Sequence, residues 1–534
     1  MKLTESKSKG SNFLIGAFII ALSHILVKII GAVYKIPLDG LILKTEGMGI
    51  YSSSYTIYNW LFVISTAGLP VAISKMVAEA RAVGKLKESE KIFKISKILL
   101  FFVGITAFLI MFIFAVPFSK LIKAESSYLT MMVMAPSLFF VAMSSSFRGY
   151  YQGKENMFPT AISEIIEALF KLIFGLSFAY LAMKIWNKAY IGSAGAISGI
   201  TLGTLFSFLF LVIYHKNKKE TIKISEFNDK VTSSKTILLK LVKLAIPVTL
   251  GVSVFTLTSL IDTAMVMNQL YGLGYEEAQR LSMFGYLNRA ITLFNLPPTV
   301  IASIAISIVP AIASAIALGD EKSAHKNVQS ALRLTVLFAM PCAAGLCSLA
   351  KPILTLLYHD GNYSFLLNIM GIATLFVTVV QVSNAILQAY SKPWIPVKNM
   401  FIGGVVKVVV NLILVSRPEI NINGAPVGTT LCYFTVMSLN IMAIRKYSGA
   451  KFSLSSFVLK PLILGIVTAV SAFYSYKVFV GILGNTIGVF GAIIVAGICY
   501  LLIMLLIKAL SKDDVLLLPR GDRICNILER YKLI

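Results

Sequence analysis

The chain has 534 residues, of which 57% are apolar and 14% are charged, whereas soluble domains carry about 25% charged residues. Its 49 Lys and Arg residues outnumber its 24 Asp and Glu residues, which gives a net charge of +25. A secreted, fibrous, disordered or nucleic-acid-binding protein is excluded, and an all-α polytopic membrane protein is predicted. Membrane spans need about 20 apolar residues each, and the cytoplasmic loops between them collect Lys and Arg.

Apolar runs that end at charged residues, glycine or proline predict about fourteen transmembrane helices. The predicted spans lie near residues 13–38, 48–77, 92–119, 128–150, 159–183, 191–214, 238–267, 281–316, 327–357, 364–390, 395–416, 425–445, 456–479 and 485–509.

Lys and Arg concentrate at the N-terminus, in the second and sixth connectors and in the C-terminal tail, whereas the connectors 39–47 and 268–280 hold one basic residue each. Because basic loops stay on the cytoplasmic side, both termini are predicted to be cytoplasmic. That orientation requires an even number of spans, which fourteen satisfies.

Two sequence patterns each occur twice in the chain, and the separation between the two copies is nearly the same for both patterns. Ala-x-Ala-x-Ala-x-Gly at 78–84 returns at 313–319, and Gln152 and Lys171 return as Gln388 and Lys407. We interpret this as the duplication of a six-helix unit, with the substrate expected between the two copies. The predicted parts are an N-lobe (1–215), a cytoplasmic linker (216–236), a C-lobe (237–447), and helices 13 and 14 with a basic tail (448–534).

Basic residues inside membrane spans are costly, at about 2.5–3.5 kcal/mol each, and usually face a cavity or a partner. Lys28 and Lys35 share a face of the first helix, and His24 lies one turn before Lys28. Lys35 is near the end of the helix, so snorkelling of its ammonium to the membrane surface explains its presence in the span equally well. Arg289 precedes a Pro-Pro pair at 297–298 that should kink the eighth helix. A cavity function is favoured for Lys28 and Arg289, since no nearby acid neutralises them.

Other charges in the spans have more than one interpretation. Glu164, Glu167 and Lys171 share one face of the fifth helix, and we interpret them as an internally satisfied polar network of the N-lobe. Asp262 and Lys407 are lone opposite charges at corresponding depths of the second lobe. They could form a buried pair, a cation site or a proton carrier, and the sequence leaves these three open.

The positive charge of Lys28, Lys35 and Arg289 favours an anionic ligand, and phosphate groups are anions that Arg binds well. The five cysteines are scattered, and no Walker motif, Ser/His/Asp set or metal-binding cluster is present in the sequence. A transporter that needs no cofactor is therefore predicted, driven by the membrane potential or by a cation such as Na⁺ or H⁺. An enzyme acting on a lipid-linked substrate is the alternative class, and it would need paired acids or an Asp-rich loop.

Four segments carry motifs of a known group. They are a basic-x-x-Gly pattern at 28–31, the run Phe-Arg-Gly-Tyr-Tyr-Gln-Gly-Lys-Glu-Asn-Met at 147–157 followed by Pro159, Arg289 followed by Leu-Pro at 296–297, and Leu-Gln-Ala-Tyr at 387–390 with Pro-Val-Lys at 396–398 and Asn411. With these motifs the chain resembles the multidrug/oligosaccharidyl-lipid/polysaccharide exporter superfamily, and within it the MurJ and SpoVB/YtgP group of flippases for lipid-linked peptidoglycan precursors. The signature residues of the second segment are Arg148, Gly149, Gln152, Gly153, Asn156 and Pro159.

The resemblance implies that Lys28, Lys35 and Arg289 bind the diphosphate of an undecaprenyl-linked sugar, with Asn59 as a further polar residue of the cavity. We expect His24, one turn before Lys28, to contribute to the same site. The resemblance also implies alternating access in a bacterial cytoplasmic membrane, with the polyprenyl tail in a groove bordered by helices 13 and 14. A monomer in a phospholipid bilayer is expected, with no nucleic-acid partner. The expected substrate is lipid II, for cell-wall or spore-cortex synthesis. The alternatives are another undecaprenyl-linked polysaccharide unit and, less favoured, a drug for ion-coupled export.

The chain departs from the group at three places. Phe62 stands where an arginine is expected, and lysines at two cavity positions cannot form the bidentate contacts of arginine. Asp262 and Asn411 match positions that hold sodium in some relatives, whereas Lys407 takes another ligand position. Our hypothesis is that the Lys407 ammonium replaces sodium by pairing with Asp262.

Overall fold

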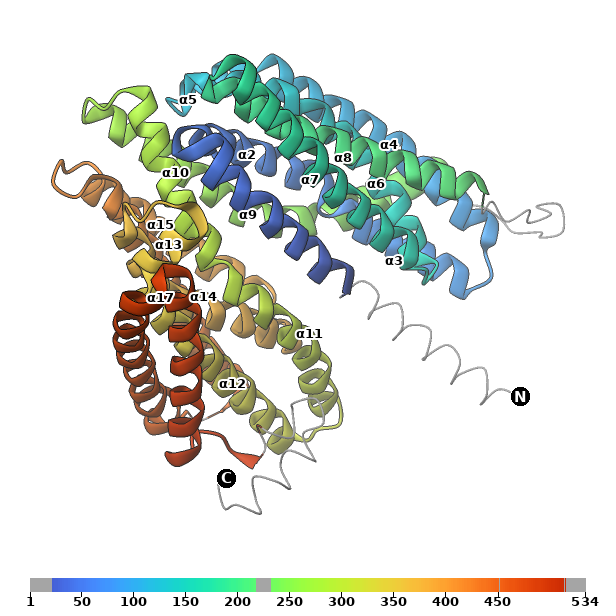
Figure 1. Ribbon diagram of the computed structural model, residues 1–534. Helices are drawn as coiled ribbons and strands as arrows, with labels where there is room; N and C mark the ends of the chain where they lie inside the picture. The colour runs from blue at the N-terminus through green and yellow to red at the C-terminus, as the bar shows by residue number, and fades with distance from the viewer. Residues whose placement is uncertain (1–21, 218–231, 451, 513, 515–534) are drawn as a thin grey trace. The chain divides into compact units, whose positions relative to one another are not determined.

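The computed structural model describes residues 22–217, 232–450, 452–512 and 514 (Figure 1). These residues form helices and turns, with no strand among them. Ten helical segments of this described part are long and apolar enough to cross a membrane. The all-α fold is thus confirmed, and the helices are consistent with fourteen spans. Parts of the first span, of the linker and of the basic tail lie outside the described residues.

Two compact units make up the chain, residues 1–271 with 275–285 and residues 272–274 with 286–534. The first unit begins with a helix at residues 22–37. It continues through η1 (Leu38–Leu43), α2 (Lys44–Thr66), α3 (Leu69–Ala82), α4 (Leu86–Ile113), α5 (Ala115–Leu121), η2 (Glu125–Ser127), α6 (Tyr128–Gly153), α7 (Phe158–Trp186), α8 (Ala189–Asn217), α9 (Ser234–Gly272) and the start of α10 (Glu277–Phe294).

The second unit holds the rest of α10 and the remaining helices. These are α11 (Leu296–Ala317), α12 (Glu321–Ser348), α13 (Ala350–Tyr358), α14 (Ser364–Ala389), α15 (Trp394–Leu414), η4 (Asn421–Asn423), α16 (Gly424–Ser448), η5 (Ser455–Leu459) and α17 (Lys460–Leu506).

The helix α9, which the sequence assigns to the C-lobe, belongs to the first compact unit. Its residues Ile237, Leu241 and Ala245 are buried in the apolar core formed with α3, α4, α6 and α8. The Gly68 amide donates to Thr249 Oγ1 at 3.1 Å. The compact units therefore differ from the predicted lobes, whose boundaries stay a prediction.

The landmarks of the predicted duplication form matching corners. After α3 and α11, Gly84 and Gly319 adopt φ of +75° and +72°. After α6 and α14, Glu155 and Ser391 both adopt φ of +58°. The backbone hydrogen bonds repeat as well: Lys85 N to Ala80 O and Asp320 N to Ala315 O at the first pair of corners, Asn156 N to Tyr151 O and Lys392 N to Leu387 O at the second. These matching corners support the duplication.

Interrupted helices occur where the sequence predicts them. The helix break between α10 and α11 falls at Asn295, and Pro297 occupies the first turn of α11, where its missing N–H costs no helical hydrogen bond. The long helix α17 is broken at Gly484, with φ of +73° and non-helical ψ. Figure 1 shows the two limbs of α17 folded back on each other, which corresponds to the predicted helices 13 and 14.

Candidate functional site

A charged cluster links three helices of the first unit. The Arg148 guanidinium on α6 donates to Ser163 Oγ and Glu167 Oε2 on α7, and to Ser207 Oγ on α8, each at 3.0 Å. We call these four residues the charged node. The side chains of Arg148 and Glu167 are 15% and 31% exposed, so the ion pair is neither fully buried nor on the surface.

The close approach of α7 and α8 brings the members of the node together. A Cβ at Gly203 would lie 2.6 Å from the Glu167 carbonyl oxygen, and one at Gly199 would lie 2.4 Å from the Gly175 amide nitrogen. Only glycine permits this contact between backbones. Figure 1 shows the two helices running side by side.

The three charged residues of the predicted polar network do share one face of α7, but each has a different partner. Glu167 pairs with Arg148, and Glu164 pairs with His24 Nε2 at 3.3 Å. The Lys171 ammonium lies 4.9 Å from the ring centre of Tyr34 and 6.0 Å from that of Tyr55. All three residues are therefore engaged within the first unit, and their action as one polar network stays a prediction.

The signature segment forms the corner between α6 and α7. Gly149 and Gly153 pack against α3, because a Cβ would lie 2.9 Å from the Pro70 carbonyl and 2.6 Å from the Ser74 carbonyl. At the corner itself, the Gln152 carbonyl accepts from the Glu155 amide and the Asn156 side chain accepts from the Phe158 amide. Pro159 lies buried in the first turn of α7. Apart from Arg148, the signature residues position helices.

The first helix carries the predicted cavity cations. Lys28 is exposed and Lys35 is half-buried. Asp39, 1% exposed, lies one turn after Lys35, and its negative charge attracts the Lys35 ammonium. The first unit therefore presents Lys28 as an accessible cation and holds Lys35 beside a buried acid.

An aromatic row on α2 was not singled out in the sequence. Tyr51, Tyr55, Tyr58 and Phe62 follow one another at ring-centre distances of 6.2, 5.7 and 6.0 Å. Their spacing of four, three and four residues is that of one helix face, and it could have been found in the sequence. Asn59 is half-buried on the same helix. A cavity of about 110 Å³ adjoins the row, lined by Tyr55, Tyr58, Phe62, Glu167, Lys171 and Ile200.

Arg289 lies in the second unit and is paired, contrary to the sequence analysis. Its side chain is 3% exposed, and Nη1 lies 3.2 Å from Asp360 Oδ2. Tyr286 donates to the same oxygen at 2.7 Å. The guanidinium also faces the rings of Tyr286 and Tyr358, at 5.2 and 4.9 Å. The expectation that no acid neutralises Arg289 was wrong, because the acid lies 71 residues away in the chain.

Asp360 lies between α13 and α14 and is held in its charged form. Burial raises the pKa of its carboxyl, but the hydrogen bonds from Tyr286 and the Asn362 amide and the charge of Arg289 outweigh this. The net effect is a pKa below the usual 3.8. The pair therefore remains ionised at neutral pH.

The residues of the predicted cation or ion-pair site belong to different units. Asp262 is half-buried on α9 in the first unit, whereas Lys407 and Asn411 lie on α15 in the second. The Asn411 side chain is 1% exposed, and its Oδ1 lies only 2.0 Å from the point that a Cβ on Gly428 would occupy. The pairing of Lys407 with Asp262 stays a prediction.

The chain matches known proteins along most of its length. Residues 13–316 match the family described as "Polysaccharide biosynthesis protein". The relatives in Bacillus subtilis (strain 168) include the uncharacterized membrane protein YabM, the lipid II flippase MurJ and stage V sporulation protein B, at 26%, 24% and 24% identity. These matches cover 81%, 83% and 95% of this chain and 80%, 85% and 98% of the relatives.

Two solved structures have the same fold. A multidrug resistance MATE family transporter of the MOP superfamily, in an inward-facing conformation, matches with a TM-score of 0.68 at 13% identity, over 79% of this chain and 94% of that one. The lipid II flippase MurJ, in an inward closed conformation, matches with a TM-score of 0.66 at 15% identity, over 92% and 98%. The fold is therefore that of a multi-pass α-helical membrane protein. The chain belongs to the polysaccharide biosynthesis protein family.

Proposed function

We propose that this protein is a flippase that moves an undecaprenyl-diphosphate-linked peptidoglycan precursor, lipid II, from the inner to the outer leaflet by alternating access. The observation that carries the proposal is the similarity to a lipid II flippase and to a sporulation protein over 83% and 95% of the chain. Lys28, Lys35 and Arg289 support it, because basic groups inside membrane spans suit a substrate whose one fixed feature is a diphosphate.

In this mechanism the Arg289 guanidinium leaves the Asp360 carboxylate and binds the diphosphate of the substrate instead. The Arg289 guanidinium is paired with Asp360 at 3.2 Å. A diphosphate offers more charge and a bidentate acceptor, so it competes for the guanidinium. The pair keeps a buried cation neutralised until the headgroup arrives, and the exchange links binding to the α13–α14 corner that holds Asp360.

The polyprenyl tail needs an apolar path, and the second unit offers one. A cavity of about 670 Å³ lies between α12, α14, α16 and the first limb of α17, and its lining includes Met340, Phe376, Ile441, Leu462 and Ile466. We assign the tail to this side of α17. The protein would work as a monomer with both termini in the cytoplasm, driven by the membrane potential or a cation gradient.

The test is complementation of a bacterial strain depleted of its own lipid II flippase, scored by growth and by lipid II accessible from outside. Rescue is expected from the wild-type protein and is lost in Arg289→Ala. Leu318→Ala, an 83% exposed position in the same unit, is the matched control. Absence of rescue despite normal membrane expression would contradict the lipid II assignment.

A second candidate substrate is another undecaprenyl-linked polysaccharide unit. The description of the family that matches residues 13–316 favours this substrate. Its diphosphate would be bound in the same way as that of lipid II. Accumulation of a different lipid-linked glycan in a strain lacking this protein would identify it. Export of cationic drugs is disfavoured because the accessible charge of Lys28 would repel the substrate.

A further inference from the structure

We propose that the cavity between α2, α7 and α8 is a saccharide-binding subsite, in which Tyr55 stacks on a pyranose ring while Glu167 and Lys171 bind its polar substituents. The proposal rests on the proposed function for the source of the glycan. The site itself lies wholly within the first unit and is defined by residues of three helices.

The aromatic wall presents one ring to a ligand. Tyr51 and Tyr58 are 6% and 5% exposed, whereas Tyr55 between them is 39% exposed. Tyr51 and Tyr55 lie nearly parallel, with 7° between their planes and ring centres 6.2 Å apart. An exposed aromatic ring is a surface on which the apolar C–H face of a pyranose packs.

Glu167 is a preoriented acceptor. Its Oε2 is occupied by Arg148 at 3.0 Å, while its Oε1 accepts no hydrogen bond from any described residue. Arg148 is itself fixed by Ser163 and Ser207. The carboxylate is therefore held in place at the edge of the cavity with one oxygen available for a sugar hydroxyl or amide.

Lys171 supplies the opposite charge. Its ammonium is bounded by the rings of Tyr34 and Tyr55, and no carboxylate of the described residues lies within 4.0 Å of it. The Tyr34 hydroxyl is already used, because it donates to the Ala196 carbonyl at 3.1 Å. The ammonium thus keeps donors for a ligand oxygen.

The combination selects a saccharide over simpler ligands. An apolar chain would cover Glu167 and Lys171 without hydrogen bonds, which is costly. A small inorganic anion would make no use of the aromatic wall, and an organic cation would meet the Lys171 charge. A sugar ring with hydroxyl, amide and acidic substituents satisfies the aromatic face and both charges at once.

The experiment measures binding of soluble probes to the full chain in lipid nanodiscs by saturation-transfer NMR. The probes are the disaccharide N-acetylglucosaminyl-N-acetylmuramic acid and, separately, inorganic diphosphate. Tyr55→Ala is expected to weaken disaccharide binding about tenfold, since an aromatic contact is worth about one factor of ten. Tyr55→Phe keeps the ring and should bind nearly as well as wild type, which shows that the fold tolerates change there. Lys171→Met should also weaken the disaccharide.

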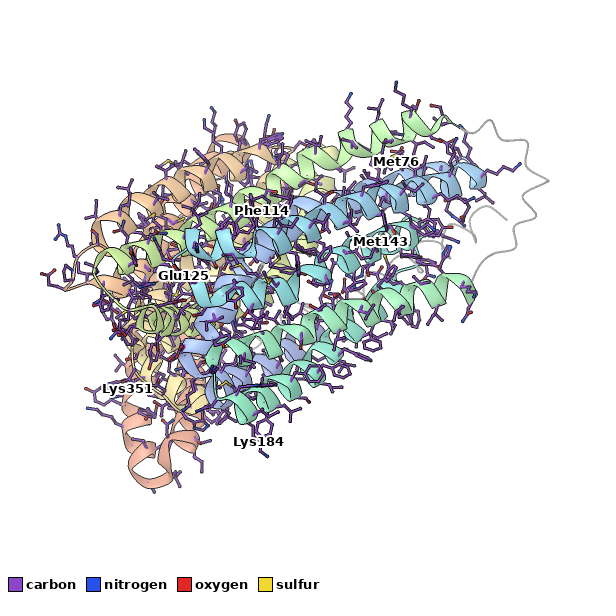
Figure 2. All side chains as sticks on the ribbon, turned by 90° about the horizontal axis from the view of Figure 1, so that it is seen from above. Met76, Phe114, Glu125, Met143, Lys184 and Lys351 are labelled. Atoms are coloured by element: carbon purple, nitrogen blue, oxygen red, sulfur yellow. The ribbon has the colours of Figure 1, made fainter. Side chains whose placement is uncertain are left out.

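Tyr180→Ala is the matched control. Tyr180 is 55% exposed on α7, and Lys184 lies 6.0 Å from its ring centre, the same distance as Lys171 from Tyr55. Figure 2 labels Lys184 on this helix. Tyr180 does not line the cavity, so its replacement should leave disaccharide binding unchanged.

The outcomes separate the subsite from the proposed function. Equal disaccharide binding by wild type and Tyr55→Ala, or no binding by wild type at millimolar disaccharide, would overturn the subsite even if the protein rescues a flippase-depleted strain. Disaccharide binding that depends on Tyr55, in a protein that fails to rescue, would keep the subsite and reject lipid II transport. Diphosphate binding should be insensitive to Tyr55→Ala, and a parallel loss of both probes would also overturn the subsite.

Discussion

The two halves of the molecule place different chemistry at the same positions of a duplicated fold. Arg148 and Ser163 correspond to Asn384 and Asn399 at the offset that relates Lys171 to Lys407. In the first unit they form the charged node with Glu167 and Ser207. In the second unit Asn399 donates to Asn440, which donates to Ser383 and Asn384, at 2.8–2.9 Å. We call these four residues the neutral node.

The two nodes differ in how far their side chains are exposed. Asn399 and Asn440 are 7% and 0% exposed, because amides can satisfy one another without the desolvation cost of an ion. Glu167 takes part in the charged node and remains 31% exposed beside a cavity. The neutral node holds helices together, whereas the charged node also places the Glu167 carboxylate beside the cavity.

Breaking the charged node should have the largest effect on stability. Arg148→Ala removes three hydrogen bonds and leaves Glu167 without its cation, so we expect a loss of about 2–3 kcal/mol. Thermal unfolding in detergent measures it. The double variant Arg148→Asn with Glu167→Gln should lose less than the sum of the single variants, by about 1 kcal/mol. Additive losses would contradict a coupled node.

The ion pair of the second unit should show a dependence on pH. Asp360→Asn removes the anion beside the buried Arg289, and a loss of about 1–2 kcal/mol is expected at pH 7. The pKa of Asp360 is lower in the folded protein than the usual 3.8. Its contribution is therefore complete above the unfolded pKa, near pH 4, and is lost as the pH falls further through the folded pKa.

The measurement is the difference in unfolding temperature between wild type and Asp360→Asn at pH 7 and at pH 3. The difference should shrink at the lower pH, because protonation removes the same charge from wild type. A difference independent of pH would show that the Asp360 charge does not stabilise the fold. Asp320, which caps α12 through Ser323, is a comparison carboxylate in the same unit.

Breaking the neutral node should cost less than breaking the charged one. Asn440→Ala leaves Asn399, Ser383 and Asn384 each without one partner, and we expect about 1–2 kcal/mol. No charge is left uncompensated, so the effect should not change with salt. A larger loss than that of Arg148→Ala would reverse the comparison between the nodes.

The smallest loss of stability is expected at the two helix corners that follow α3 and α11, and it tests whether these corners are equivalent. Gly84 and Gly319 have nearly the same positive φ, and a Cβ at either would meet no atom within 4 Å. Replacement by alanine therefore costs only the backbone strain, about 1 kcal/mol at each position. The shift in unfolding temperature should be the same for Gly84→Ala and Gly319→Ala, and clearly unequal shifts would argue against equivalent corners.

Much of the architecture follows from local features of the sequence. The apolar runs predicted the helices, and the prolines at 297–298 predicted the interruption at Asn295. The repeated Ala/Gly motif predicted a duplication, and its two copies form corners of nearly the same geometry. Each of these features depends on residues within a few turns of one another. The aromatic row on α2 belongs with them, since its spacing is local.

The partners of the charged residues depended on the tertiary structure. Sequence spacing placed Glu164, Glu167 and Lys171 on one face, but it could not tell that the first helix and α6 supply the contacts cited for them. It also missed Asp360 beside Arg289. Helix formation and polarity are local and periodic, so the sequence by itself determined the membrane-spanning helical fold and its duplication. Which side chains meet across helices depends on how those helices rotate and how closely they pack, and only the tertiary structure decided that.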